Sequence, residues 1–153
     1  MFNKLRIAVV IFITTVIVGV VTATPTGMVQ SELNKGWRFR QARLQQWRTA
    51  TVPGVVHTDL LDHGLIEEPF FRLNERSVQW VDKEDWVYET TFDIPAKMLG
   101  YKNYRLVFNG LDTYADVELN GEKILSADNM FRRWPVDLSL IHISEPTRLG
   151  MIS

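Results

Sequence analysis

Two histidines and two aspartates stand close together in the sequence, as His57, Asp59, Asp62 and His63. Imidazole nitrogens and carboxylate oxygens are common zinc ligands, so this cluster suggests a metal site. However, His57 and His63 are six positions apart, which places them on different faces of an α-helix, whereas the two-histidine zinc motif needs them four apart. We therefore predict surface or helix-capping roles for these side chains, and neither a metal site nor a cofactor.

Carboxylates are frequent in the stretch that follows. Glycoside hydrolysis needs two carboxyl groups about 5 to 9.5 Å apart across a sugar. The candidates are Glu67, Glu68, Asp82, Glu84 and Asp85. Adjacent residues in a loop do not establish such a spacing, so we interpret these residues as solvated loop charges.

The sequence also contains no Ser-His-Asp arrangement, glycine-rich phosphate loop or nucleotide fingerprint.

Aromatic side chains could instead bind sugar rings by stacking, and the chain contains 5 tryptophans. Trp37 and Trp86 lie on segments that alternate like strands, so we predict that they fill a core. Trp80 lies in a long loop, where sugar binding or an interdomain contact is as plausible as packing. It is our candidate substrate-binding residue.

Short alternating segments must position these side chains. Apolar alternation bounded by turn residues predicts strands within residues 36–42, 46–52, 85–95, 103–110 and 113–125. The last of these segments is predicted to be a hairpin, since Asn120 and Gly121 supply the positive φ angles of a two-residue turn.

One short helix is predicted between the second and third strands. Val56, Leu60 and Leu61 share a helical face, and Gly64 stands where the helix would end. Residues 65–85 show no sustained period, so we interpret them as a long surface loop. Strands linked by turns predict an antiparallel β-sandwich. We count five or six strands from Arg38 to Asp137, fewer than the eight of a jelly roll, so the sandwich should be incomplete.

Residues 1–23 have the features of a secretory signal peptide. Lys4 and Arg6 precede an uncharged apolar run over residues 7–21 and then small residues that end at Ala23. The run is shorter than the ~20 apolar residues of a membrane-spanning helix, although an uncleaved membrane anchor is the alternative. We predict cleavage after Ala23 and export to the periplasm or the medium.

Length and composition restrict the remaining possibilities. The chain has 153 residues, of which 46% are hydrophobic, enough for one globular domain. A formal charge of -1 with scattered basic residues gives no reason to expect a nucleic-acid partner. Because the chain has no cysteine, it has no disulfide framework and no thiolate nucleophile. We predict a flexible segment over residues 24–32, a domain over 33–137 and a separate tail over 138–153.

Three separated stretches resemble the N-terminal region of β-mannosidases of glycoside hydrolase family 2, in the family's order. They are VPGVVHTDL at residues 52–60, WVDKEDWVYE at 80–89 and GLDTYADVELNG at 110–121. The resemblance covers residues 33–137. It implies a jelly roll like a galactose-binding domain, which would be the first domain of a longer enzyme.

The resemblance also implies an activity for that longer enzyme, which would remove terminal non-reducing β-D-mannose residues from β-D-mannosides with retention. Its acid/base and nucleophile glutamates would lie in a downstream (β/α)₈ barrel, and neither has a matching position in this chain. We therefore expect this chain to be inactive alone, to pack on its own catalytic domain and to meet an oligosaccharide substrate through that barrel. The alternatives are a free-standing carbohydrate-binding module or part of a β-galactosidase or β-glucuronidase of the same family.

The final segment departs from this pattern. Residues 138–148, LSLIHISEPTR, resemble the in-frame translation of a transposase-type sequencing adapter, and the departure from the family begins at the same point. The alternative is a divergent native terminus with Leu138, Leu140 and Ile143 as a weakly apolar tail. We predict that residues 138–153 are not native and that the side chains in them have no function, including His142, Glu145 and Arg148.

Overall fold

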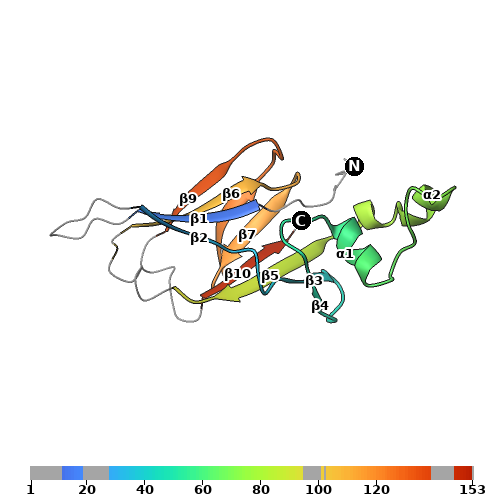
Figure 1. The fold of residues 1–153 in the computed structure, drawn as a ribbon, viewed down its shortest axis with the longest axis horizontal. Helices are drawn as coiled ribbons and strands as arrows, with labels where there is room; N and C mark the ends of the chain where they lie inside the picture. The colour runs from blue at the N-terminus through green and yellow to red at the C-terminus, as the bar shows by residue number, and fades with distance from the viewer. Residues whose placement is uncertain (1–11, 19–27, 95–100, 102, 139–146, 153) are drawn as a thin grey trace.

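Two antiparallel sheets face each other in the computed structural model, and short helices extend from one end of them (Figure 1). The structure describes residues 12–18, 28–94, 101, 103–138 and 147–152. This architecture confirms the predicted all-β antiparallel sandwich.

The larger sheet has six strands in the order β4-β3-β5-β10-β7-β8. Neighbouring strands in it are all antiparallel. The bounds of its strands are β3 Arg38–Gln41, β4 Arg48–Thr49, β5 Trp86–Phe92, β7 Ala115–Leu119, β8 Glu122–Ala127 and β10 Thr147–Ile152.

The smaller sheet has four strands in the order β2-β1-β6-β9. These pairs are also antiparallel. The bounds of its strands are β1 Phe12–Val18, β2 Met28–Glu32, β6 Tyr104–Gly110 and β9 Trp134–Leu138.

The predicted hairpin is confirmed. Strands β7 and β8 pair antiparallel, and Leu119 lies opposite Glu122. Asn120 and Gly121 between them have φ angles of 54° and 84°, the left-handed conformation that a tight hairpin turn requires. The turn residues therefore set the register of these two strands.

The predicted counts of strands and helices were too low. Among the described residues, seven strands, β3 to β9, begin between Arg38 and Asp137. We did not predict β9, because proline is unusual inside a strand and β9 contains Pro135, although Trp134, Val136 and Leu138 do alternate with exposed residues. The helix α1 Val56–Asp62 is confirmed, but α2 Asn74–Val78 and the 3₁₀ helix η1 Val81–Lys83 lie in the segment that we interpreted as a loop. Helices of about one turn are too short to show a helical period.

Three strands lie in segments with other predicted roles. β2 falls in the segment predicted to be flexible, of which residues 28–32 form this strand and residues 24–27 lie outside the described residues. β1 falls in the predicted signal peptide and β10 in the tail predicted to be non-native. Strand pairing does not test the processing or the origin of a segment, so these two remain predictions. No helix in the described residues is long and apolar enough to cross a membrane.

Individual residues of the tail can be placed only in part. Arg148 forms an ion pair with the buried carboxylate of Glu89, which also pairs with Arg38. His142 and Glu145 lie outside the described residues. The prediction that these tail side chains have no function is not tested by these contacts.

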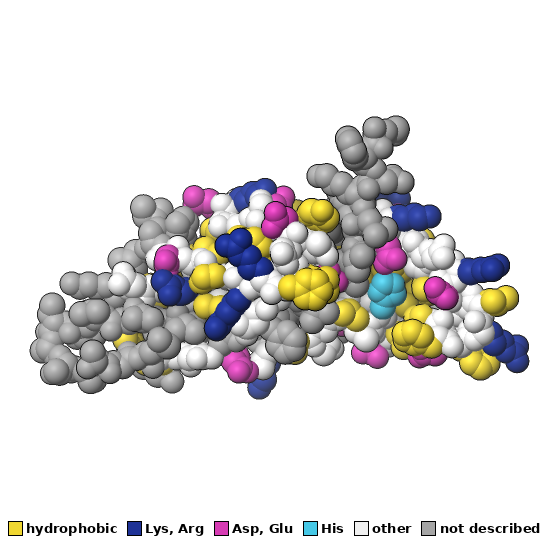
Figure 2. Space-filling model, turned by 90° about the horizontal axis from the view of Figure 1, so that it is seen from above, with side chains coloured by type: hydrophobic (Ala, Val, Ile, Leu, Met, Phe, Trp, Pro, Cys, Tyr) yellow, Lys and Arg dark blue, Asp and Glu magenta, His cyan; other side chains and the backbone are white. Residues whose placement is uncertain are grey.

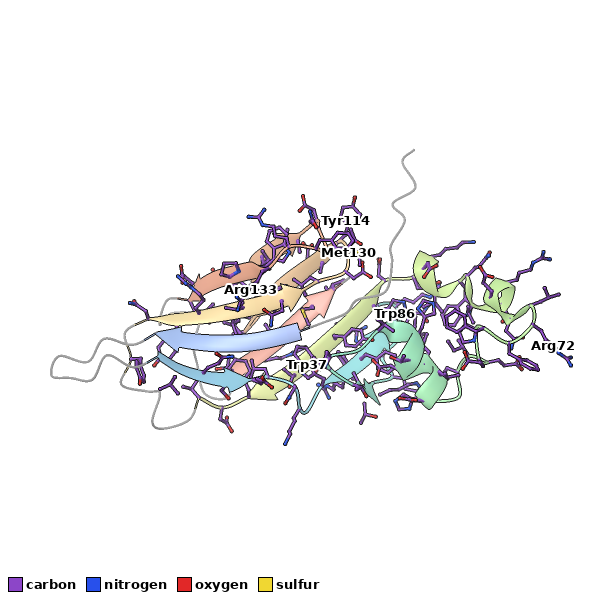
Figure 3. All side chains as sticks on the ribbon, turned by 45° about the horizontal axis from the view of Figure 1, so that its top comes forward. Trp37, Arg72, Trp86, Tyr114, Met130 and Arg133 are labelled. Atoms are coloured by element: carbon purple, nitrogen blue, oxygen red, sulfur yellow. The ribbon has the colours of Figure 1, made fainter. Side chains whose placement is uncertain are left out.

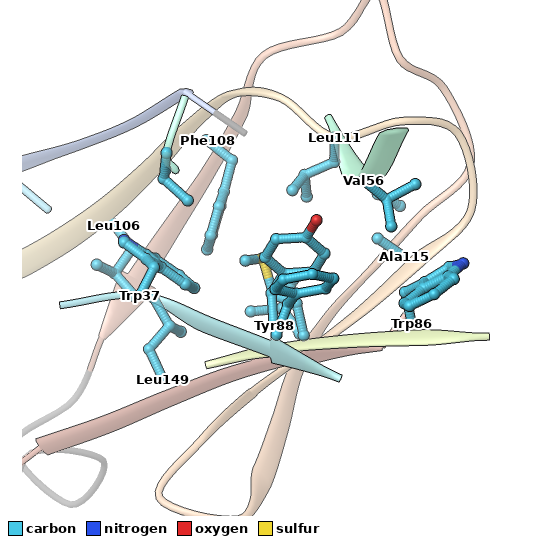
Figure 4. Close-up of a cluster of buried hydrophobic side chains, with 14 of the residues drawn as sticks. Trp37, Val56, Trp86, Tyr88, Leu106, Phe108, Leu111, Ala115 and Leu149 are labelled. Carbon is cyan, nitrogen blue, oxygen red and sulfur yellow. The ribbon is translucent and has the colours of Figure 1, made fainter. Parts of the chain in front are cut away.

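Aromatic and aliphatic side chains fill the space between the two sheets (Figure 4). Trp37 and Trp86 are 3% and 6% exposed, which confirms their predicted core positions. Each indole N–H has an acceptor, since Trp37 Nε1 donates to the Leu33 carbonyl at 2.8 Å and Trp86 Nε1 to the Val81 carbonyl at 3.0 Å. The second of these bonds ties η1 to β5.

A buried carboxylate attaches α1 to the larger sheet. Asp59 is 2% exposed, and it accepts hydrogen bonds from the Thr51 amide at 2.8 Å and from the Tyr88 hydroxyl at 2.8 Å. Burial raises the pKa of Asp59, and the two hydrogen bonds offset part of that rise. One carboxyl group thus joins α1, the loop before it and β5.

The first prediction concerns the stability that this carboxyl group provides. Asp59→Ala should lower the free energy of unfolding of the chain by about 1–3 kcal/mol, because it leaves the buried hydroxyl of Tyr88 and the part-buried amide of Thr51 without their acceptor. Urea unfolding measures the change. Asp62→Ala on the exposed face of the same helix is the control and should change the free energy of unfolding by less than about 0.5 kcal/mol. Equal losses in the two variants would contradict this role of Asp59.

The second prediction concerns pH. Because the pKa of Asp59 is raised in the folded state, the folded chain binds more protons than the unfolded chain between the ordinary and the raised pKa values. The contribution of Asp59 to the free energy of unfolding should therefore be largest at low pH and fall as the pH rises through this window. Urea unfolding of the native chain and of Asp59→Asn across this range isolates the effect. An unchanged pH dependence in the variant would exclude it.

Candidate functional site

A pocket with a volume of about 820 Å³ opens at the end of the sandwich that carries the helices. Its walls come from α1, residues 68–70, α2 and η1. Figure 2 shows hydrophobic side chains among acidic and basic ones at this end of the molecule. The apolar part of the lining comprises Val55, Leu61, Pro69, Phe70 and Val78.

The amphipathic character of α1 gives the pocket its first wall. Val56, Asp59 and Leu60 are buried against the sandwich. His57, Thr58 and Leu61 therefore face the other way, and all three line the pocket. The N-terminus of the helix is held by Thr58, whose hydroxyl donates to the Val55 carbonyl at 2.7 Å.

The second wall comes from the chain between α1 and β5. The carbonyl of Glu68 accepts from the Phe71 amide at 3.1 Å and from the side chain of Asn74 at 3.1 Å, which closes a turn before α2. Arg72 has a φ angle of 56°, a conformation that costs a non-glycine residue of the order of 1 kcal/mol or more. It stands at the far end of the molecule from the sheets (Figure 3).

The two histidines and two aspartates that stand close together in the sequence make separate contacts in the structure. His57 Nε2 lies 3.8 Å from Asp82 Oδ1, across the pocket from α1 to η1. His63 Nε2 donates to the Thr49 carbonyl at 2.8 Å, and its ring lies 5.8 Å from that of Phe39. Asp59 is buried and accepts the two hydrogen bonds described above, so the predicted surface or capping role is wrong for this residue. In the part of the chain that the structure describes, no three His, Asp or Glu side chains gather in a way that could hold a metal ion.

The loop carboxylates also have separate surroundings. Glu68 accepts from the Phe70 amide at 3.4 Å, Asp82 faces His57, and Glu84 pairs with Arg43 at 2.5 Å. Glu67 is exposed. The arrangement therefore brings Glu68 and Asp82 to the pocket lining but gives these residues different partners.

Trp80, the candidate from the sequence, packs beside the pocket. Its ring lies 6.0 Å from that of the buried Trp86, and 38% of the residue remains exposed. The pocket itself is lined by its neighbours Val78, Gln79 and Asp82. Phe70, Glu75 and Gln79 line the pocket although they were not predicted as site residues. The spacing of four between Glu75, Gln79 and Lys83 could have indicated a shared helical face.

Residues 37–149 match the model of a protein family described as glycosyl hydrolase 2 galactose-binding domain-like. The match extends past Asp137, the predicted end of the domain, to Leu149. It includes the whole of the pocket lining.

Two curated relatives and one solved structure are similar to the chain. It is 42% identical over 114 residues to β-mannosidase B of Emericella nidulans and 36% identical over 107 residues to β-mannosidase of Rattus norvegicus, which cover 72% and 70% of this chain. The crystal structure of a β-D-mannosidase from Dictyoglomus thermophilum superimposes with a TM-score of 0.75 and 40% identity over 78% of this chain.

These alignments involve only a small part of each similar protein. The chain spans 13% and 12% of the length of the two relatives and 15% of the solved chain. The family match, in contrast, covers most of this chain. The chain therefore belongs to the glycosyl hydrolase 2 galactose-binding domain-like family.

Proposed function

We propose that this chain is the N-terminal domain of an exported, exo-acting β-mannosidase that removes terminal non-reducing β-D-mannose residues from β-D-mannosides. The observation that carries the proposal is the similarity to β-mannosidases in both sequence and fold, at 40% identity and a TM-score of 0.75 for the solved structure. The hydrolytic residues would belong to a downstream domain that this chain does not include.

The requirements of glycoside hydrolysis support the assignment of catalysis to a downstream domain. Retaining glycoside hydrolysis requires an acid/base and a nucleophile carboxyl group about 5–5.5 Å apart. The two carboxylates of the pocket lining that have partners, Glu68 and Asp82, are engaged by a backbone amide and by a histidine. We assign the acid/base and the nucleophile to two glutamates of a downstream (β/α)₈ barrel.

We further propose that this domain packs on that barrel through the segment between α1 and η1. Leu65, Phe71 and Leu73 are 43%, 56% and 70% exposed in this segment. Exposed apolar side chains that gather in one place are typical of a surface that another domain covers. Burial of each would contribute up to about 1.5–3 kcal/mol to domain association.

The ends of the chain are part of the same proposal. Residues 1–23 are a signal peptide, and residues 138–153 are translated adapter sequence. In the structure β10 lies between β5 and β7, and its Leu149 and Met151 are buried. Under this proposal a strand from the native downstream sequence takes that position in the whole protein.

A third prediction follows for export. If the gene product is secreted with its own leader, the mature protein should begin at Thr24, because Val21 and Ala23 are the small residues that a signal peptidase recognises. Intact-mass or N-terminal analysis of the exported product measures this start. Replacing Ala23 with a large charged residue should block processing. An exported product that retains Met1 would contradict cleavage and support an uncleaved anchor.

A fourth prediction compares the hydrolytic activity of this chain with that of the whole protein. The purified 153-residue chain should release no product from an aryl β-mannoside, because it lacks the paired catalytic carboxyl groups. The whole protein should hydrolyse the same compound and leave aryl β-galactosides and β-glucuronides intact. Turnover by the chain alone would overturn the assignment of catalysis to the barrel. Preference of the whole protein for a galactoside or glucuronide would overturn the proposed substrate.

A further inference from the structure

We propose that the pocket between α1 and α2 binds one hexopyranose unit of a β-mannoside chain, as a site separate from the hydrolytic residues. The choice of mannose rests on the proposed function, whereas the choice of a neutral sugar rests on the pocket itself. Its volume of about 820 Å³ lies within the range of about 300–1,000 Å³ that is usual for ligand pockets.

One wall of the pocket contains an aromatic side chain that is exposed to solvent. Phe70 is 96% exposed although it lines the pocket, and Pro69 lies beside it. The Phe70 ring adds almost nothing to the core, and aromatic rings pack well against the apolar C–H face of a sugar ring. The side chain is thus available as a platform for a pyranose.

Three polar side chains continue the lining along one face. Glu75 and Gln79 come from α2 and its C-terminal end, and Lys83 comes from η1. A carboxylate accepts, an ammonium donates and an amide does both, so together they complement hydroxyl groups that donate and accept. Within the described residues, no hydrogen bond or ion pair joins these three side chains to another residue. They are therefore free to engage a ligand.

The charges of the lining favour a neutral ligand over an anion. Glu68, Glu75 and Asp82 contribute three carboxylates, against Lys83 and the imidazole of His57. His57 is already 3.8 Å from Asp82, which leaves Lys83 as the lining cation without a paired carboxylate among the described residues. A phosphorylated or carboxylated sugar would meet net repulsion here. Mannose and its β-linked oligomers carry no charge.

The position of the pocket fits a site used by the whole enzyme. Its Phe70 lies next to the exposed apolar residues proposed to meet the barrel, Phe71 and Leu73. The pocket would therefore open at the boundary between two domains, where ligand sites often occur. A β-mannoside chain held there would extend across this boundary.

The test is a titration of the 153-residue chain with β-1,4-mannobiose and mannotriose, followed by tryptophan fluorescence and calorimetry. Trp80 follows Gln79 directly and is partly exposed, so its emission should change with occupancy. We expect saturable binding that Phe70→Ala and Glu75→Gln each weaken by about tenfold, which corresponds to ~1.4 kcal/mol. Both side chains are exposed, so these variants should keep the fold, which circular dichroism checks.

The matched control is Phe131→Ala. Phe131 is 92% exposed and does not line the pocket, and its neighbour Met130 lies well away from Arg72 in Figure 3. This variant should bind like the unsubstituted chain. No saturable binding, or equal binding by Phe70→Ala, would overturn the site. Tighter binding of mannose 6-phosphate would overturn its preference for a neutral sugar. Sugar binding is measured on the isolated chain, whereas the proposed activity is measured as hydrolysis by the whole protein. Failure of the proposed sugar site can therefore be distinguished from failure of the proposed function.

Discussion

The candidate site depends on one buried carboxyl group. Asp59 accepts the Thr51 amide and the Tyr88 hydroxyl, each at 2.8 Å, and so fixes the rotation of α1 about its own axis. With Val56, Asp59 and Leu60 directed into the sandwich, the opposite face of the helix must form a wall of the pocket. The bond from Trp86 to the Val81 carbonyl holds η1 in the same way, and with it Asp82 and Lys83. Three hydrogen bonds, two at Asp59 and one from Trp86, thus determine where the polar groups of the pocket stand.

The sequence predicted the elements whose signal is local. The segments of β5 and β6 were predictable from a period of two in their sequences, although Trp86 to Thr90 of β5 are all buried in the structure. The hairpin was predictable because the turn at Asn120 and Gly121 needs a φ angle that few other residues adopt. Strand β9 was not, because Pro135 is unusual in a strand and pairing with β6 decides its conformation. The pocket was predicted least well. α2 and η1 are too short to show a helical period in the sequence. Trp80 was predicted as the binding residue and lies in the correct segment, but its neighbours Val78 and Gln79 form the lining.

The two ends of the chain occupy comparable positions in the fold. β1 lies between β2 and β6 in one sheet, and β10 lies between β5 and β7 in the other. A strand in such a position satisfies backbone donors and acceptors on both sides, so each sheet needs some segment there. Under the proposal that the leader is removed and the tail is not native, the whole protein must supply both segments from elsewhere. This requirement agrees with the expectation of an incomplete sandwich and with the small share of the relatives' length that the chain spans.

The proposed function requires that this domain belongs to a longer β-mannosidase. The most direct measurement is a long-read sequence of the source DNA across the codon for Asp137. We expect the reading frame to continue past this codon, without the sequence of residues 138–153, into a (β/α)₈ barrel with paired glutamates. A genome that encodes Leu138 to Ser153 followed by a stop codon would contradict it.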